Sequence, residues 1–232
     1  MKQHFSIIII LLSYGCTSNI PPKDAVPVDT VAAPAVVQER VYSLLSTTKC
    51  EQTRLSGQFD LAVELNRYTD KITHYDSCSL KVLIRDKKTG NPLDSILMSS
   101  LFYFSKTFSN CDSTMSFSTH FNVARPIVDN YFGDLVVADL NFDGRDDIAV
   151  IKDMGGADGP VYQYYLQTGH KRFVPDRFLT DTVSHFPAAI DPSAKTLILY
   201  VRSGINTAWQ YRYTLNSQMN SWKLTRHKLN TE

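Results

Sequence analysis

The residues best suited to chemistry form one short acidic run in the second half of the chain. Residues 139–147 read Asp-Leu-Asn-Phe-Asp-Gly-Arg-Asp-Asp, which is the spacing D-x-N-x-D-G-x-x-D. In such a loop the side chains at positions one, three and five turn oxygen atoms inwards, and a glycine at position six allows a sharp turn. Because Ca²⁺ is a hard cation that takes six to eight oxygen ligands, the run predicts a calcium loop. We call residues 139–147 the acidic loop.

Five residues of the acidic loop are the predicted ligands, four through their side chains and one through its backbone carbonyl: Asp139, Asn141, Asp143, Asp147 and, by its carbonyl, Arg145. Position twelve is Val150, where an EF-hand has a bidentate Glu, so the set is incomplete. A further ligand would come from water, Asp153, Asp158 or a backbone carbonyl. Mg²⁺ fits less well because it requires near-octahedral geometry. The alternative interpretation is a solvated acidic turn between two strands.

The elements around the acidic loop have the patterns of strands. Residues 135–138 and 148–151 are unbroken apolar runs of strand length on either side of it. Apolar side chains alternate with period two in five further segments: residues 59–65, 80–84, 115–121, 197–201 and 209–215. About ten short strands separated by turn segments predict an all-β fold. We expect an antiparallel β-sandwich or barrel-like domain with a strand-loop-strand calcium site.

The N-terminal segment has the features of an export signal. A weakly basic start is followed by an apolar run at residues 5–12, too short to span a bilayer, and then by Ser-Tyr-Gly-Cys. This ending resembles a bacterial lipobox, although Tyr14 stands where a small residue is usual. It predicts lipidation at Cys16, which would anchor the protein to a membrane, at the periplasmic face of the outer membrane. The alternative is an ordinary secretory signal with an incidental cysteine.

These patterns divide the chain into three parts. We expect a lipoprotein signal peptide at residues 1–15, a lipid-attachment segment and Pro/Ala-rich tether at residues 16–45, and a single β-rich domain at residues 46–232. Export makes one disulfide plausible among Cys50, Cys78 and Cys111, and the sequence does not choose the pair.

Several function classes are disfavoured by composition and motif. The 24 Lys and Arg residues nearly balance the 23 Asp and Glu residues, and they form no dense basic patch, so we expect no nucleic-acid partner. The histidines are scattered, and the sequence contains neither an HExxH zinc motif nor a GxSxG nucleophile elbow. We therefore expect that the protein is not an enzyme.

The order of motifs after the acidic loop resembles a known family. Residues 137–150 (VADLNFDGRDDIAV) are followed by GGADGP at residues 155–160, YQYYL at residues 162–166, KRFV at residues 171–174 and IDPSAKTL at residues 190–197. This order is similar to that of bacterial periplasmic lipoproteins related to the I-type lysozyme inhibitors. Some members of that family are Ca²⁺-dependent immunity proteins against peptidoglycan-hydrolysing effectors. The resemblance covers roughly residues 134–200 and implies a β-sandwich or barrel-like fold.

Two function hypotheses follow. The first is a cell-envelope inhibitor or immunity protein that binds a peptidoglycan hydrolase, with Asp158 and Tyr162 of the glycine-rich segment 153–162 as partner contacts. The second is a structural or adhesion Ca²⁺-binding lipoprotein of FG-GAP type, which repeated four-stranded units would favour.

Overall fold

The structure is a computed structural model that describes residues 41–72, 76–100, 113–123, 127, 130–204 and 207–230. The chain divides into two units, Met1–Glu39 and Arg40–Glu232, and every described residue belongs to the second. The predicted signal peptide and most of the predicted tether lie outside the described residues. The first strand, β1, begins at Tyr42, inside the segment expected to be tether.

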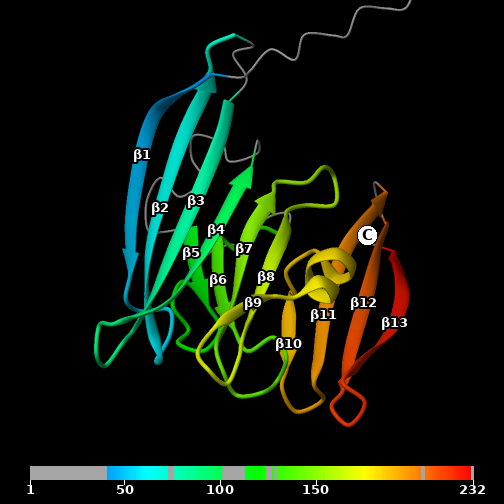
Figure 1. Ribbon diagram of the computed structural model, residues 1–232. Coiled ribbons are helices and arrows are strands. Elements are labelled where there is room, and N and C mark those ends of the chain that lie inside the picture. Colours follow the sequence, from blue (N-terminus) through cyan, green and yellow to red (C-terminus); the bar gives the residue numbers. More distant parts are fainter. Residues whose placement is uncertain are drawn as a thin grey trace, which may run out of the picture. The chain divides into compact units, whose positions relative to one another are not determined.

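The second unit is an all-β domain of three sheets, as predicted (Figure 1). The first sheet is an antiparallel meander of four strands: β1 (Tyr42–Gln52), β2 (Phe59–Asp70), β3 (Asp76–Asp86) and β4 (Pro92–Ser100). Its side chains alternate between buried and partly exposed along most of β2. This is the pattern expected of strands that cover a core with one face only.

The second sheet has five strands in chain order: β5 (Thr114–Ser116), β6 (Leu135–Ala138), β7 (Asp147–Asp153), β8 (Val161–Gln167) and β9 (Phe173–Pro175). Only the β5–β6 pair is parallel. All of β6 and the first five residues of β7 are buried, which explains why both read as unbroken apolar runs. Beside them lies a cluster of aromatic rings: Phe117, Phe132, Tyr162, Tyr164 and Phe186.

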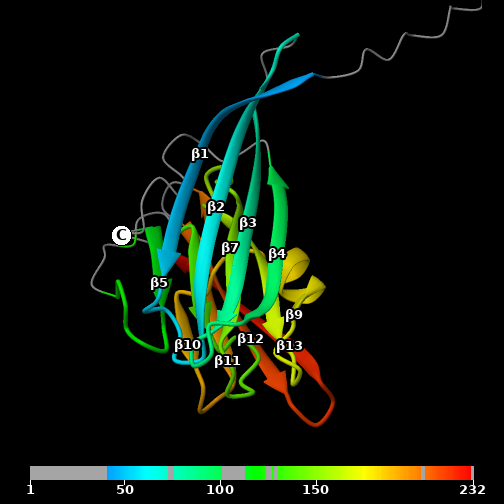
Figure 2. The ribbon, with the colours of Figure 1, turned by 60° about the vertical axis from the view of Figure 1, so that its left-hand side comes forward.

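The third sheet is another antiparallel meander: β10 (Ala189–Asp191), β11 (Thr196–Gly204), β12 (Thr207–Asn216) and β13 (Ser221–Asn230). A short π-helix, η2 (Leu179–Val183), precedes it, and the Tyr213 hydroxyl donates to the carbonyl of Thr182 at 3.4 Å. The first and second sheets meet at β4 and β9 (Figure 2), where the Phe173 amide donates to Asp94 at 2.8 Å.

Two local expectations were wrong. The alternation at residues 115–121 predicted a longer strand, but β5 ends at Ser116 and the chain then turns. His120 and Asn122 adopt positive φ in this turn, and the apolar side chains pack from a loop instead. β4 was missed altogether, since Leu97 is exposed between two buried apolar neighbours and breaks the expected alternation of apolar and polar residues.

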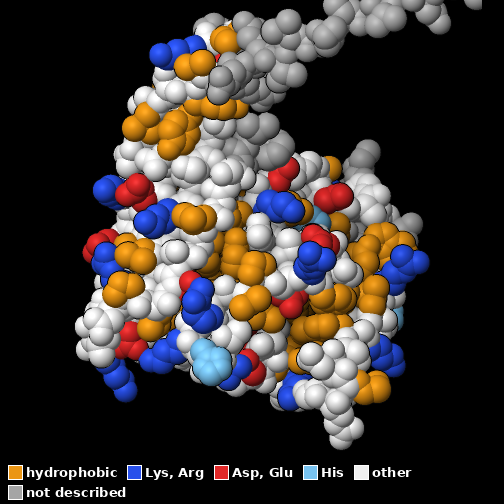
Figure 3. Space-filling model, viewed as in Figure 1, with side chains coloured by type: hydrophobic (Ala, Val, Ile, Leu, Met, Phe, Trp, Pro, Cys, Tyr) orange, Lys and Arg blue, Asp and Glu red, His pale blue; other side chains and the backbone are white. Residues whose placement is uncertain are grey.

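The structure also bears on the cysteines and on the distribution of surface charge. Cys50 in β1 is disulfide-bonded, whereas Cys78 in β3 is a buried thiol, so the bridge uses Cys50 and not Cys78. Cys111 lies outside the described residues. On the face seen in Figure 3, described basic and acidic side chains are interspersed, which agrees with the nearly balanced charge of the chain.

Candidate functional site

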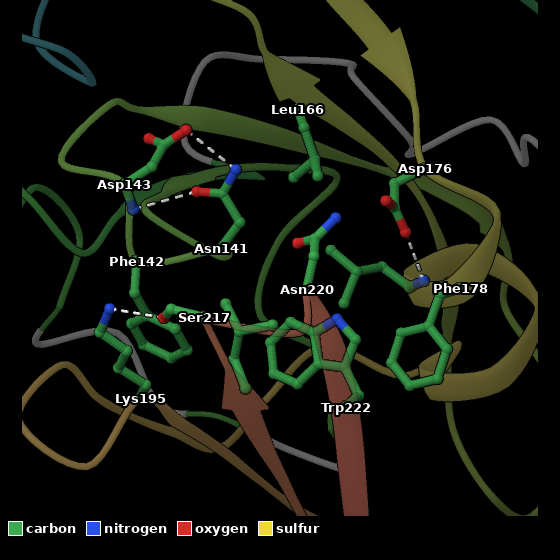
Figure 4. A pocket seen from close by; sticks show the side chains of 12 residues that line it. Asn141, Phe142, Asp143, Leu166, Asp176, Phe178, Lys195, Ser217, Asn220 and Trp222 are labelled. Atoms are coloured by element: carbon green, nitrogen blue, oxygen red, sulfur yellow. Dashed lines mark hydrogen bonds between the residues drawn. The ribbon is translucent and has the colours of Figure 1, made fainter.

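The acidic loop connects β6 to β7, so two buried strands hold its ends, as expected. Its first side chain folds back over the turn. The Asp139 carboxylate accepts hydrogen bonds from the amides of Asp143 at 3.1 Å and Gly144 at 2.8 Å. The Asn141 side-chain oxygen also accepts from the Asp143 amide at 3.1 Å, and Asp143 accepts from the Arg145 amide at 2.9 Å (Figure 4 shows Asn141 and Asp143). The side-chain oxygens at positions one, three and five therefore all face the inside of the turn.

Two residues of the loop have left-handed backbone. Gly144 has φ +82°, and no atom lies within 4 Å of the place where a Cβ would be. The glycine predicted at this position is therefore required by the backbone conformation and not by lack of space. Phe142 has φ +59°, a conformation that costs a non-glycine residue about 1 kcal/mol or more. The hydrogen bonds on either side of Phe142 hold it in place and direct its ring towards Trp222 of β13, at 6.3 Å between ring centroids.

Asp147 is the last residue of the acidic loop, and its side chain is fully buried. One of its oxygens accepts from the Leu140 amide at 2.9 Å, and the other accepts from the Gln167 amide of β8 at 2.8 Å. The pKa of Asp147 is raised to about 8, mainly by burial; the two amides lower it, and the neighbouring Asp143 and Asp139 carboxylates add to the rise. Burial also raises the pKa of Asp139, with Asp143 adding to it. Asp143 is therefore close enough to Asp139 and Asp147 to disfavour the ionised forms of those two carboxyls.

Asp146 was not predicted as a site residue, yet it fixes the position of the loop. It is buried and accepts hydrogen bonds from the hydroxyls of Ser56 at 2.7 Å and Ser118 at 2.5 Å. Ser56 lies between β1 and β2, and its hydroxyl also accepts from the amides of Gln58 and of Phe59, the first residue of β2. The sequence carries no signal for this connection because the two residues are 90 positions apart.

Arg145 has a second role besides the predicted carbonyl ligand. Its guanidinium forms an ion pair with Asp143 and donates from Nε to the carbonyl of Gln167 at 3.1 Å. In this structure the guanidinium occupies one oxygen of a predicted ligand. A cation bound in the loop would compete with Arg145 for that oxygen.

The donor set fits Ca²⁺ in its chemistry, since every candidate atom is a carboxylate, amide or carbonyl oxygen. Within the described ranges, however, no three His, Cys, Asp or Glu side chains are grouped so as to hold one metal ion. The oxygens of the acidic loop are directed at its own amides, and ion binding would need Asn141 and backbone carbonyls as well. The structure brings the predicted ligands into one loop, and calcium binding stays a prediction.

Two of the expected auxiliary ligands are ruled out by position. The acidic loop precedes β7, whereas Asp153 ends β7 and Asp158 lies beyond it (Figure 1). The seven residues of β7 span about 20 Å. Neither carboxylate can therefore complete a site in the loop. For the same reason an ion in the loop would not directly restrict the glycine-rich segment.

The predicted partner contact at Tyr162 is also corrected. Its side chain is fully buried in the aromatic cluster, and its hydroxyl donates to the carbonyl of Gly133 at 2.9 Å and accepts from the amide of Phe132 at 3.2 Å. Tyr162 is a core residue, because alternation placed it on the inner face of β8. Asp158 is exposed at a turn, so its predicted role as a partner contact stays a prediction.

Comparison with known proteins adds one distant likeness. No protein-family model matches the sequence, and no curated protein matches it. A solved structure described as a Xanthomonas Type IV Secretion System related protein is similar at 16% sequence identity, over 80% of this chain and 88% of that one, with a TM-score of 0.47. In the part of the chain that the structure describes, no helix combines the length and apolarity of a membrane span.

Proposed function

We propose that this protein is a calcium-binding lipoprotein of the bacterial cell envelope that binds and inhibits a peptidoglycan hydrolase. The observation that carries the proposal is the acidic loop itself, a turn between two buried strands whose candidate ligand atoms are all oxygens. The lipobox-like ending at Cys16 and the family resemblance supply the compartment and the class of partner. We expect no catalytic activity of the protein's own.

Calcium would act in this proposal by fixing one end of the domain. Asp139, Asn141 and Asp143 would hold the ion, with the carbonyl of Arg145 and the Asp147 carboxylate below. The ion would offset the mutual repulsion of the carboxylates and release the Arg145 guanidinium from Asp143. The surface that calcium orders would then be the acidic loop and the segments beside it, at the opposite end of β7 from Asp158.

The test is a pull-down with lysozyme-type and other muramidase folds, run with Ca²⁺ and with EGTA. We expect capture of at least one peptidoglycan hydrolase with Ca²⁺, weakened by EGTA and by Asp139→Ala. Asp158→Ala changes a predicted partner contact outside the acidic loop, so it should weaken capture while leaving Ca²⁺ affinity unchanged. Failure to bind any such hydrolase, those of neighbouring bacteria included, would reject the inhibitor proposal and leave calcium binding as a separate question.

A structural or adhesion role is the second candidate, and the topology favours it in one respect. Three consecutive antiparallel meanders of four strands follow one another along the chain, as β1–β4, β6–β9 and β10–β13. Repeated four-stranded units are what an FG-GAP-type protein would have. Only the second of the three meanders carries the D-x-N-x-D-G spacing, however. Binding to cell surfaces without any effect on hydrolases would favour this alternative.

A further inference from the structure

A cavity lies between the acidic loop and the β12–β13 hairpin, and its chemistry is that of a ligand site (Figure 4). Its volume is about 500 Å³, within the range of about 300–1,000 Å³ typical of small-molecule sites. Segments far apart in the sequence contribute to its lining, among them the acidic loop, the start of η2 and the β12–β13 hairpin. Asp143, Ser217 and Asn220 are exposed, so the cavity is open to solvent.

One side of the cavity is a wall of aromatic rings. Trp222 stacks on Phe178 with ring centroids 5.6 Å apart and planes at 9°, and Phe142 packs at 6.3 Å from the other side. All three rings are only partly buried, unlike Phe132 and Tyr162 of the core cluster. Because these packing contacts fix the rings before any ligand arrives, little side-chain entropy is lost on binding.

Hydrogen-bond donors and acceptors lie beside this aromatic wall. Asp176 accepts from the Leu179 amide at 2.7 Å through one oxygen, and its other oxygen accepts no hydrogen bond from the residues described. The Asn220 amide, at the tip of the hairpin, likewise has no hydrogen-bond partner within the described segments. Its backbone φ of +46° turns it at this position. Figure 4 shows both side chains beside the cavity. The site therefore offers an acceptor and a combined donor and acceptor next to apolar ring surface.

Two of the three charged side chains at the cavity already have partners. Asp143 is paired with Arg145, and Lys195 donates to the Ser217 hydroxyl at 2.7 Å. A ligand that binds Asp143 or Lys195 through its own charge would have to displace an existing partner, whereas a neutral ligand can bond to the second oxygen of Asp176 without doing so. The aromatic rings can pack against an apolar ligand face, and the polar side chains can hydrogen-bond to ligand hydroxyl groups. Together they match a molecule that is apolar on its faces and hydroxylated at its edges.

We propose that this cavity is a binding site for a neutral saccharide, whose ring lies against the Phe142–Trp222–Phe178 wall while its hydroxyl groups bond to Asp176 and Asn220. The site would be a property of the protein in addition to the proposed inhibition of a hydrolase. It needs no hydrolase for its test.

The two tryptophans of the chain allow a direct test. Trp209 lies outside the cavity, under the guanidinium of Arg226, so the full chain with Trp209→Phe reports on Trp222 alone. Its fluorescence is followed while the trimer of N-acetylglucosamine or the glucose trimer cellotriose is added, in Ca²⁺ and in EGTA, with calorimetry in parallel. We expect saturable binding of at least one sugar, seen as a change in Trp222 emission.

The decisive variant is Asn220→Gly, which removes the amide but tolerates the positive φ of the turn. We expect the affinity for the sugar to fall about three- to tenfold, as for the loss of one hydrogen bond, with an unchanged melting temperature. Trp222→Leu should abolish binding. The proposal is overturned if neither sugar binds at millimolar concentration in either buffer, or if Asn220→Gly binds as tightly as its parent.

Discussion

Replacing Asp146 by Ala removes the carboxylate that joins the acidic loop to the first sheet. The hydrogen bond from Ser56 is buried and ends on a charged group, and such bonds contribute about 1.5–3 kcal/mol. The bond from Ser118 adds little, since that serine is exposed and water can replace the carboxylate. We expect Asp146→Ala to lower the free energy of unfolding by about 2–3 kcal/mol. For a domain of this size that corresponds to roughly 4–12 °C in Tm.

The assay is urea unfolding of wild type, Asp146→Ala, Ser56→Ala and the double variant. If the bond carries the effect, the double variant will lose less than the two single losses combined, by about 1–3 kcal/mol. Asp158→Ala serves as a control, because an exposed aspartate should change the stability by less than about 0.5 kcal/mol. Additive losses, or an Asp146→Ala protein as stable as wild type, would refute this account of how the loop is anchored.

Three further predictions concern the core, an ion pair and the anchor. Tyr162→Phe should cost about 1–3 kcal/mol in urea unfolding, because it leaves the buried Gly133 carbonyl and Phe132 amide without the hydroxyl; an unchanged midpoint would contradict the core assignment. The Lys171 ammonium holds the pKa of Asp86 at about 2, below its ordinary 3.8, so the pair stabilises the fold above about pH 4 and loses this effect as the pH falls through about 2. Wild type should therefore be more stable than Asp86→Asn near neutral pH and equal to it near pH 2, and a constant difference would argue against the ion pair. Cys16→Ser should move the protein from the membrane fraction to the soluble one, and a variant that still pellets after a salt wash would disprove lipidation.

The parts of the fold that the sequence predicted are those where local pattern and burial coincide. β2 alternates because one face is buried, and β6 and β7 are continuous apolar runs because both faces are. At residues 115–121 the alternation came from a loop whose Phe117 packs on Phe132 and Phe186, so period two did not mean a strand. β4 was not predicted because Leu97, an apolar residue on the outer face, is 72% exposed and interrupts the alternation of apolar and polar residues.

The candidate site divides in the same way between local and distant contacts. The turn of the acidic loop, with Gly144 at positive φ and oxygens from Asp139, Asn141 and Asp143 on its inside, follows from nine consecutive residues. The anchoring of Asp146 on Ser56 depends on how the first and second sheets pack, which no spacing in the sequence encodes. The expectation that Asp158 could complete the calcium site was wrong. Asp158 is near the loop in sequence, but the extended strand β7 places it far from the loop in space.

The most direct test of the central claim is calorimetric titration of Ca²⁺ into the EGTA-stripped full chain, with thermal melts in both conditions. We predict saturable binding with a Kd in the micromolar to millimolar range. At one hundred times Kd, Ca²⁺ should add about 2.7 kcal/mol to the stability of the folded state. Asp139→Ala and Asp143→Ala should abolish the heat of binding and the gain in Tm, whereas Asp158→Ala should keep both. A protein that gives no heat with Ca²⁺ and melts identically in Ca²⁺ and EGTA would contradict the account.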